Sequence, residues 1–109
     1  MLVLVDESLP KRIRREMPGF NVRTVPQQGR SKTKNGALLR LAEGAGFEAF
    51  LTADQSLQYQ QNLAASKLRI IVFAAPSNRM EHIGPLVPQA IVALREMRTG
   101  ELRTIRGGG

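Results

Sequence analysis

The stretch FEAFLTADQSLQYQQ, residues 47–61, runs an apolar segment directly into Asp54. The N-terminal stretch MLVLVDES, residues 1–8, does the same and runs into Asp6. These two residues are the only aspartates of the chain. Short, continuous apolar runs of this kind are typical of strands that are buried on both faces of a parallel sheet. The sequence therefore predicts two buried strands, each followed by a carboxylate.

Strand and helix patterns alternate through the rest of the chain. Besides the strands at 2–5 and 49–53, we expect strands at 20–25, 68–75 and 100–106. Helical patterns lie between the strands. The first runs from Pro10 to Pro18 with Ser8 as its cap, and the second runs from residue 35 to Gly44 or Gly46. A short third helix begins at Asp54 or Ser56, and a fourth covers residues 79–98. This order predicts one α/β domain over residues 1–106 with a mainly parallel sheet of about five strands, followed by a disordered tail at 107–109.

The order of the elements predicts where the two aspartates lie. Right-handed crossovers place the carboxyl ends of parallel strands at one edge of a sheet, and ligands bind outside that edge near the topological switch point. If the first and third strands are neighbours, Asp6 and Asp54 converge at this edge, and Glu7 can add a third carboxylate. Converging carboxylates favour a bound cation, and oxygen ligands suit Mg²⁺ or Mn²⁺. The alternative is that each aspartate caps the helix that follows it.

Charge and composition restrict the class of protein. The chain has 109 residues, no cysteine and a formal net charge of +7. The positive charge favours a polyanion such as a nucleic acid as partner, with a solvated basic surface or a docking face for an acidic protein as the alternatives. The chain has neither a signal-peptide pattern nor an apolar run of the roughly 20 residues that a membrane span needs, so we expect a cytoplasmic protein without membrane contact.

Three stretches resemble a known family. They are LVDESLPKRI (4–13), KNGALLRLAEGAGFEAFLTADQSLQYQQNL (34–63) and RIIVFAAPSNR (69–79). Together they resemble the short bacterial PIN-like domains, which are relatives of the PIN ribonuclease domain and are often similar to toxins of toxin–antitoxin pairs. The resemblance covers about residues 1–98. It implies a three-layer α/β/α sandwich that binds Mg²⁺ or Mn²⁺ and cuts single-stranded RNA, with a small antitoxin protein as partner.

The resemblance also implies roles for individual residues. Asp6 matches the acid after the first strand, and Asp54 matches the acid of the LT-x-D motif, so both are expected to bind the metal. Glu7 is an adjacent acid. Related sequences often carry a further acid where this chain has Asn35, which offers a neutral oxygen ligand without charge. This departure predicts a weakened or inactive catalytic site.

Further residues are candidates for substrate binding. Basic and polar side chains near the same edge are expected to hold phosphate groups; these are Arg12, Arg30, Lys32, Lys34, Ser56 and Arg79. Thr52 and Gln55 flank Asp54 and can orient a ligand or make turn hydrogen bonds. His82, the lone histidine, is expected on the surface.

Three hypotheses for function follow. The first is a metal-dependent ribonuclease of the toxin type. The second is a non-catalytic PIN-like module that binds RNA or an antitoxin. The third is a receiver-like signalling domain, which also has acids after its first and third strands, although VFAAPSN lacks the lysine that receivers carry there. The sequence leaves a homodimer open.

Overall fold

The computed structural model describes residues 1–24, 35–55 and 67–107. Five strands are present in the described chain: β1 (Leu2–Val5), β2 (Asn21–Thr24), β3 (Ala49–Thr52), β4 (Arg69–Ala74) and β5 (Leu102–Arg106). The helices are the 3-10 helix η1 (Lys11–Glu16), α1 (Asn35–Gly44), α2 (Met80–Ile83), the 3-10 helix η5 (Gly84–Leu86) and α3 (Val87–Glu96). All five predicted strands are therefore confirmed, each within two residues of its expected bounds.

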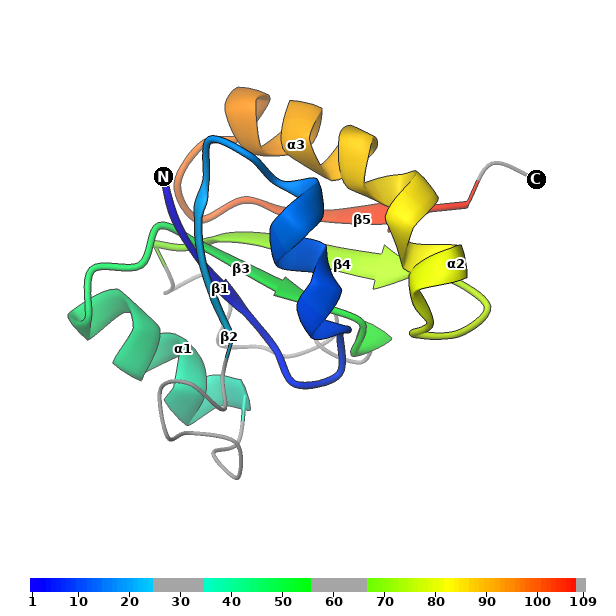
Figure 1. The fold of residues 1–109 in the computed structure, drawn as a ribbon. Helices are drawn as coiled ribbons and strands as arrows, with labels where there is room; N and C mark the ends of the chain where they lie inside the picture. Colours follow the sequence, from blue (N-terminus) through cyan, green and yellow to red (C-terminus); the bar gives the residue numbers. More distant parts are fainter. Residues whose placement is uncertain (25–34, 56–66, 108–109) are drawn as a thin grey trace.

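The strands form one sheet in the order β2-β1-β3-β4-β5, and every neighbouring pair is parallel (Figure 1). Val5 pairs with Thr24 of β2 on one side and with Leu51 of β3 on the other. The chain moves outward from β1 to β2 and then crosses back over β1 to β3. The topological switch point therefore lies between β1 and β3, where open α/β sheets bind ligands beyond their strand ends. The condition that the first and third strands are neighbours, on which the predicted convergence of Asp6 and Asp54 depends, is met.

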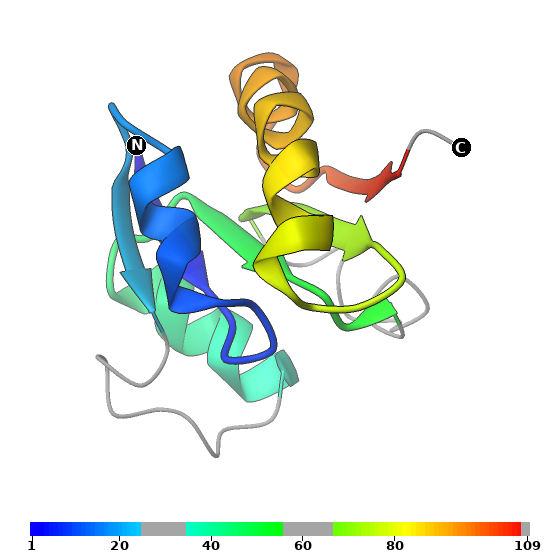
Figure 2. The ribbon, with the colours of Figure 1, turned by 45° about the vertical axis from the view of Figure 1, so that its right-hand side comes forward.

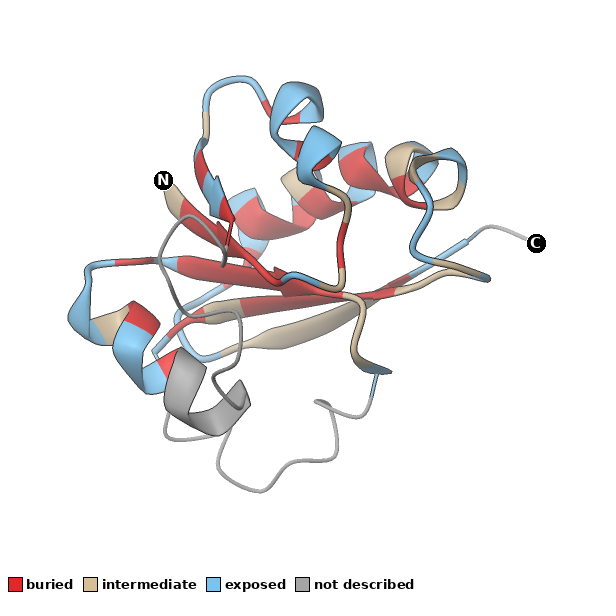
Figure 3. Cartoon of the chain, turned by 60° about the horizontal axis from the view of Figure 1, so that its bottom comes forward, coloured by how far each residue is buried: buried red, intermediate tan, exposed pale blue. Residues whose placement is uncertain are grey.

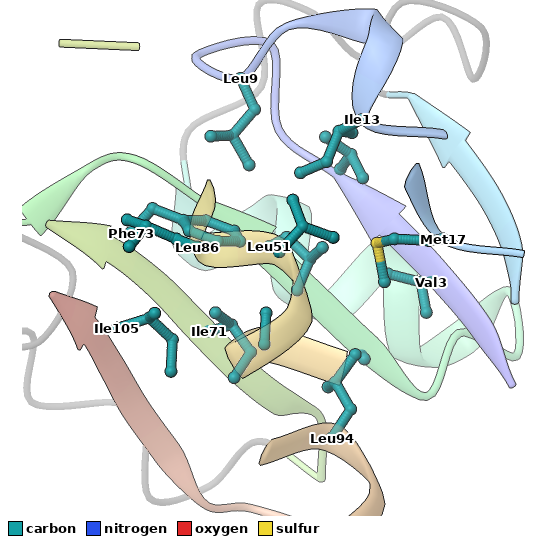
Figure 4. Close-up of a cluster of buried hydrophobic side chains, with 14 of the residues drawn as sticks. Val3, Leu9, Ile13, Met17, Leu51, Ile71, Phe73, Leu86, Leu94 and Ile105 are labelled. Atoms are coloured by element: carbon teal, nitrogen blue, oxygen red, sulfur yellow. The ribbon is translucent and has the colours of Figure 1, made fainter. Parts of the chain in front are cut away.

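Apolar side chains alternate between the two faces of the sheet, because successive residues of a strand point to opposite sides. Val3, Val5 and Ile71 pack into the larger core, beneath η1, α2, η5 and α3 (Figure 4). Leu4 and Phe50 point the other way and pack into a smaller core with residues of α1. Buried residues fill the central strands and the sheet-facing side of α3 (Figure 3). The fold is thus a compact α/β unit with an all-parallel sheet.

The segment after β1 differs from its prediction. We expected a helix capped by Ser8, but η1 is a 3-10 helix whose N-cap is Pro10 and which has no side-chain cap hydrogen bond. Bonds from Ile13 N to Pro10 O (3.2 Å) and from Met17 N to Arg14 O (3.3 Å) have the three-residue spacing of a 3-10 helix. The Ser8 hydroxyl instead donates to Asp6 and accepts from the backbone N–H of Ala53, so it is turned toward β3 and not toward the helix.

The predicted helix over 79–98 is divided into α2, η5 and α3. Pro85 lies within η5 and Pro88 within the first turn of α3, where the missing N–H is tolerated. No helix of the described segments is long and apolar enough to cross a membrane. The predicted loop at 26–34, most of the predicted helix after Asp54 and the end of the tail lie outside the described residues.

Candidate site at the carboxyl ends of β1 and β3

The site begins where β1 and β3 end side by side. The backbone N–H of Asp6 donates to the carbonyl oxygen of Leu51 at 2.9 Å, which extends the ladder one residue beyond β1. Since Val5 pairs with Leu51, this register places Asp6 beside Thr52, the last residue of β3. Two residues that are 46 positions apart therefore share the edge of the sheet at the switch point.

The Asp6 carboxylate is held by two hydroxyl groups. Its Oδ2 accepts hydrogen bonds from Ser8 Oγ at 2.7 Å and from Thr52 Oγ1 at 2.9 Å. Asp6 is 8% exposed and Thr52 is fully buried, so these bonds lie largely out of water. Hydrogen bonds to an ionised acceptor are stronger than neutral ones. The alternative that Asp6 caps the following helix is wrong, because its carboxylate accepts from these hydroxyls and η1 has no side-chain cap.

The same hydroxyls reach the turn that carries Asp54. Thr52 Oγ1 accepts a bond from the backbone N–H of Asp54 at 3.0 Å, and Ser8 Oγ accepts one from Ala53 at 3.1 Å. We call Asp6, Ser8, Thr52 and Asp54 the strand-end cluster. One oxygen atom of Thr52 thereby links the Asp6 carboxylate to the backbone of Asp54. For Thr52 the sequence left open a ligand-orienting role and a turn hydrogen bond, and the bond to Asp54 N–H is such a turn hydrogen bond. Ser8 was missed as a site residue because the sequence indicated a cap.

A cavity of about 460 Å³ opens beside the cluster. Among described residues it is lined by Asp6, Glu7, Leu9, Pro10, Lys11, Thr24, Asn78 and Arg79. We call it the strand-end cavity. Of the predicted residues it brings together Asp6, Glu7 and Arg79. Asn78 was missed: its Nδ2 donates to the carbonyl oxygen of Ser8 at 3.0 Å and ties the loop after β4 to the end of β1.

The other predicted residues are placed less closely or not described. Arg12 lies on the exposed side of η1, next to this cavity rather than in it. Asn35 begins α1, and its side chain lies outside the described part of the structure. The remaining candidates also lie outside the described residues; they are Arg30, Lys32, Lys34 and Ser56.

Two residues of the loop after β4 form their own contacts. Arg79 is exposed and pairs with Glu81 at 3.4 Å. His82, which was expected on the surface, is partly buried, and its Nδ1 lies 2.6 Å from Ser77 Oγ. The Ser77 hydroxyl also accepts a bond from the backbone N–H of Arg79 at 3.2 Å, so this short network shapes the wall that presents Arg79.

The donor set at this edge can be compared with the needs of a metal ion. Within the described residues, no three acidic or histidine side chains form a group that could hold one. Mg²⁺, however, often uses only one or two carboxylates and keeps waters or substrate phosphates as its other ligands. Asp6 and Asp54 would be the carboxylate ligands of such an ion, and the Ser8 and Thr52 hydroxyls would supply the outer hydrogen bonds that orient the Asp6 carboxylate.

Comparison of the chain with protein-family models, with curated proteins and with solved structures gave no match. The function is therefore inferred from the strand-end cluster and its surroundings. These combine a fixed carboxylate, a second aspartate just after the neighbouring strand and a partly basic cavity wall.

Proposed function

We propose that the protein is a PIN-like domain, a three-layer α/β/α sandwich, that acts on single-stranded RNA as a divalent-metal-dependent ribonuclease of the toxin type. One observation carries this proposal: Asp6 and Asp54 follow neighbouring parallel strands at the switch point, and Thr52 Oγ1 bonds both the Asp6 carboxylate and the backbone N–H of Asp54. The adjoining cavity adds Lys11 and Arg79, whose positive charge suits a phosphate backbone.

In this proposal Asp6 and Asp54 would hold Mg²⁺ or Mn²⁺. Such an ion offsets charge on a phosphoryl group and lowers the pKa of bound water. The chain's own residues do the positioning: Ser8 and Thr52 fix the Asp6 carboxylate, and Lys11 and Arg79 attract the phosphates. Two carboxylates, with Asn35 in place of a further acid, give a low local negative charge. We therefore expect weak activity.

A second function is favoured by the two hydroxyl bonds to Asp6. A carboxylate that accepts from Ser8 and Thr52 fastens β1 to β3, and this structural role needs no metal. The domain would then be a PIN-like module that binds RNA, or a small antitoxin protein, without cutting it. Both functions share the same surface and differ in whether the aspartates act on the substrate.

Cleavage of a labelled single-stranded RNA with Mn²⁺ or Mg²⁺ tests the proposal. The variants Asp6→Asn and Asp54→Asn remove one negative charge each and keep the side-chain shape. We expect each to lower the cleavage rate about 100-fold or more, as loss of a group acting in the transition state does. Glu96→Gln is the matched control, since it removes one exposed negative charge on α3.

Wild-type protein that binds RNA without cutting it would support the second function. Cleavage that both asparagine variants retain would show that a contaminating nuclease is responsible and would overturn the first. Labelling of Asp54 by a small phosphodonor such as acetyl phosphate would instead identify the receiver-like alternative.

A further inference from the structure

The exposed side of η1 is strongly basic. Four of its six residues are cations, namely Lys11, Arg12, Arg14 and Arg15. All four are exposed, whereas Ile13 is fully buried in the larger core and anchors the segment to the sheet. In the described chain the ion pairs join Arg79 to Glu81 and Arg103 to Glu96 and Glu101, and none involves a cation of η1. Every acidic residue of the sequence lies in the described segments.

These cations line a hollow of about 520 Å³. Its described lining consists of Lys11, Arg12, Arg14, Arg15 and Thr24, with no acid among them. We call it the η1 hollow. It adjoins the strand-end cavity, because Lys11 and Thr24 line both. An extended chain that leaves the strand-end cavity past Lys11 therefore enters the η1 hollow.

The ribbon of η1 faces that of α2 (Figure 2), and a third hollow, of about 500 Å³, is lined by residues of both helices. It shares Arg12 and Arg15 with the η1 hollow but also contains Glu16 and Glu81. These carboxylates repel a phosphate backbone. The η1 hollow is thus the purely cationic part of this surface, because the third hollow adds Glu16 and Glu81 and the strand-end cavity adds Asp6 and Glu7 beside Lys11 and Arg79.

We propose that the η1 hollow seats the phosphate backbone of single-stranded RNA next to the part of the strand held at Asp6. This inference rests on the proposed action on RNA and holds for both the cutting and the non-cutting form. Arginine presents a planar fork of donors that matches phosphate oxygens, and three of the four cations are arginines. The exposed residues of η1 are all charged, whereas protein interfaces depend on a central patch of apolar or aromatic side chains. This composition favours RNA over an acidic protein.

The inference is tested by RNA binding in EDTA, where no cleavage occurs, with a fluorescein-labelled 12-nucleotide oligouridine followed by anisotropy. Arg12→Gln/Arg14→Gln removes two charges from the η1 hollow. Arg40→Gln/Arg95→Gln removes two exposed charges outside the three hollows and is the matched control.

We expect Arg12→Gln/Arg14→Gln to weaken RNA binding about tenfold at 50 mM KCl. The salt slope, which is the slope of the logarithm of the binding constant against the logarithm of the salt concentration, should fall in magnitude by about 1.4, since each phosphate contact contributes about 0.7 for a single strand. The control should lose less than about threefold and keep its slope.

A third variant, Arg12→Lys/Arg14→Lys, keeps the positive charge and removes the paired N–H donors of the two guanidinium groups. It should retain the salt slope and lose only part of the affinity, which a merely misfolded protein would not do. Thermal unfolding verifies that each variant is folded.

Three outcomes would overturn the inference: equal weakening by the two glutamine pairs, competition by poly-glutamate as effective as by unlabelled RNA, or no RNA binding by the wild type. The result is separable from the proposed catalysis. Binding in EDTA that depends on Arg12 and Arg14, together with no cleavage in Mn²⁺, leaves this inference standing and removes the ribonuclease. RNA cleavage by the wild type, together with equal loss of RNA binding in the two glutamine double variants, would support the ribonuclease and overturn this inference.

Discussion

Thr52 shows how much one buried hydroxyl group determines at this site. Its single proton is donated to Asp6, and its lone pairs accept the N–H of Asp54. The Ser8 hydroxyl likewise donates its proton to Asp6. Neither hydroxyl therefore has a proton left to donate across the 3.3 Å that separates the two oxygen atoms. The orientation of the Asp6 carboxylate is therefore set by two donors from different parts of the chain.

The variant Thr52→Val preserves the shape and removes the hydroxyl. It leaves a buried carboxylate oxygen with one donor fewer and the Asp54 N–H without its acceptor. We expect the free energy of unfolding to fall by about 1–3 kcal/mol, as measured by urea denaturation. Thr99→Val, at an exposed position, is the control and should change it by less than about 0.5 kcal/mol. Equal effects of the two substitutions would contradict the role assigned to Thr52.

The end of α1 is the clearest case at the scale of an element. Phe47 N donates to Ala42 O at 3.0 Å and Gly46 N to Glu43 O at 3.1 Å, which is the pattern of a Schellman motif. Gly46 has φ of +89°, and both Phe47 and Ala42 lie in the smaller core. The turn into β3, and hence the position of Thr52 and Asp54, depends on this left-handed glycine.

Replacing each of two glycines at this end by alanine should change the free energy of unfolding in opposite directions. A Cβ at Gly46 meets no atom within 4 Å, so Gly46→Ala tests backbone conformation alone and should cost about 1–2 kcal/mol. A Cβ at Gly44 also meets nothing, but Gly44 is within α1, where alanine is favoured by up to about 1 kcal/mol. Urea unfolding of both variants measures the difference. A stabilising Gly46→Ala would rule out the motif.

A partly buried ion pair at the start of β5 gives a pH-dependent prediction. Arg103 Nε donates to the Glu101 carboxylate at 2.6 Å, and this bond, followed by the bond from the Arg98 N–H, lowers the pKa of Glu101 below its ordinary 4.5. Glu101 therefore adds stability above its ordinary pKa, and this contribution is lost as the pH falls through the lowered value. Arg103→Met should raise the pKa of Glu101 in an NMR titration, whereas Arg106→Met, further along β5, should leave it unchanged.

Much of the element pattern could be predicted from the sequence because buried parallel strands are apolar runs. This signal located β1, β3 and β4 and placed Asp6 and Asp54 at strand ends, whereas β2 and β5 were located by the alternation of apolar and polar residues. It could not reveal η1 as a 3-10 helix, since the spacing of its single buried residue, Ile13, fits either helix type. The Ser8–Asp6–Thr52 contact was also out of reach. It depends on the pairing of Val5 with Leu51, and no sequence pattern encodes that register.

For the whole molecule, the helices on the larger core connect the site to its surroundings. Ile13 and Met17 pack in the same core as Leu51 and Ile71, so the segment that carries the η1 cations rests on the strands that carry the cluster. The basic surface and the aspartates are thus parts of one packed unit. In the proposed function, RNA contacts on η1 and chemistry at the strand ends would therefore share a fixed geometry.

The net charge of +7 predicts opposite effects of salt on the free and the RNA-bound protein. Like charges repel in the free protein, and added salt screens them within a Debye length of about 10 Å at 0.1 M. The unfolding temperature of free protein should therefore rise between 50 and 200 mM KCl.

Bound oligouridine at 100 times its Kd stabilises the protein by about 2.7 kcal/mol, and salt weakens this binding steeply. With a fixed amount of RNA the unfolding temperature should therefore fall over the same range. Scanning calorimetry measures both, and a change of the same sign in the two samples would show that the positive charge is not neutralised by RNA phosphates.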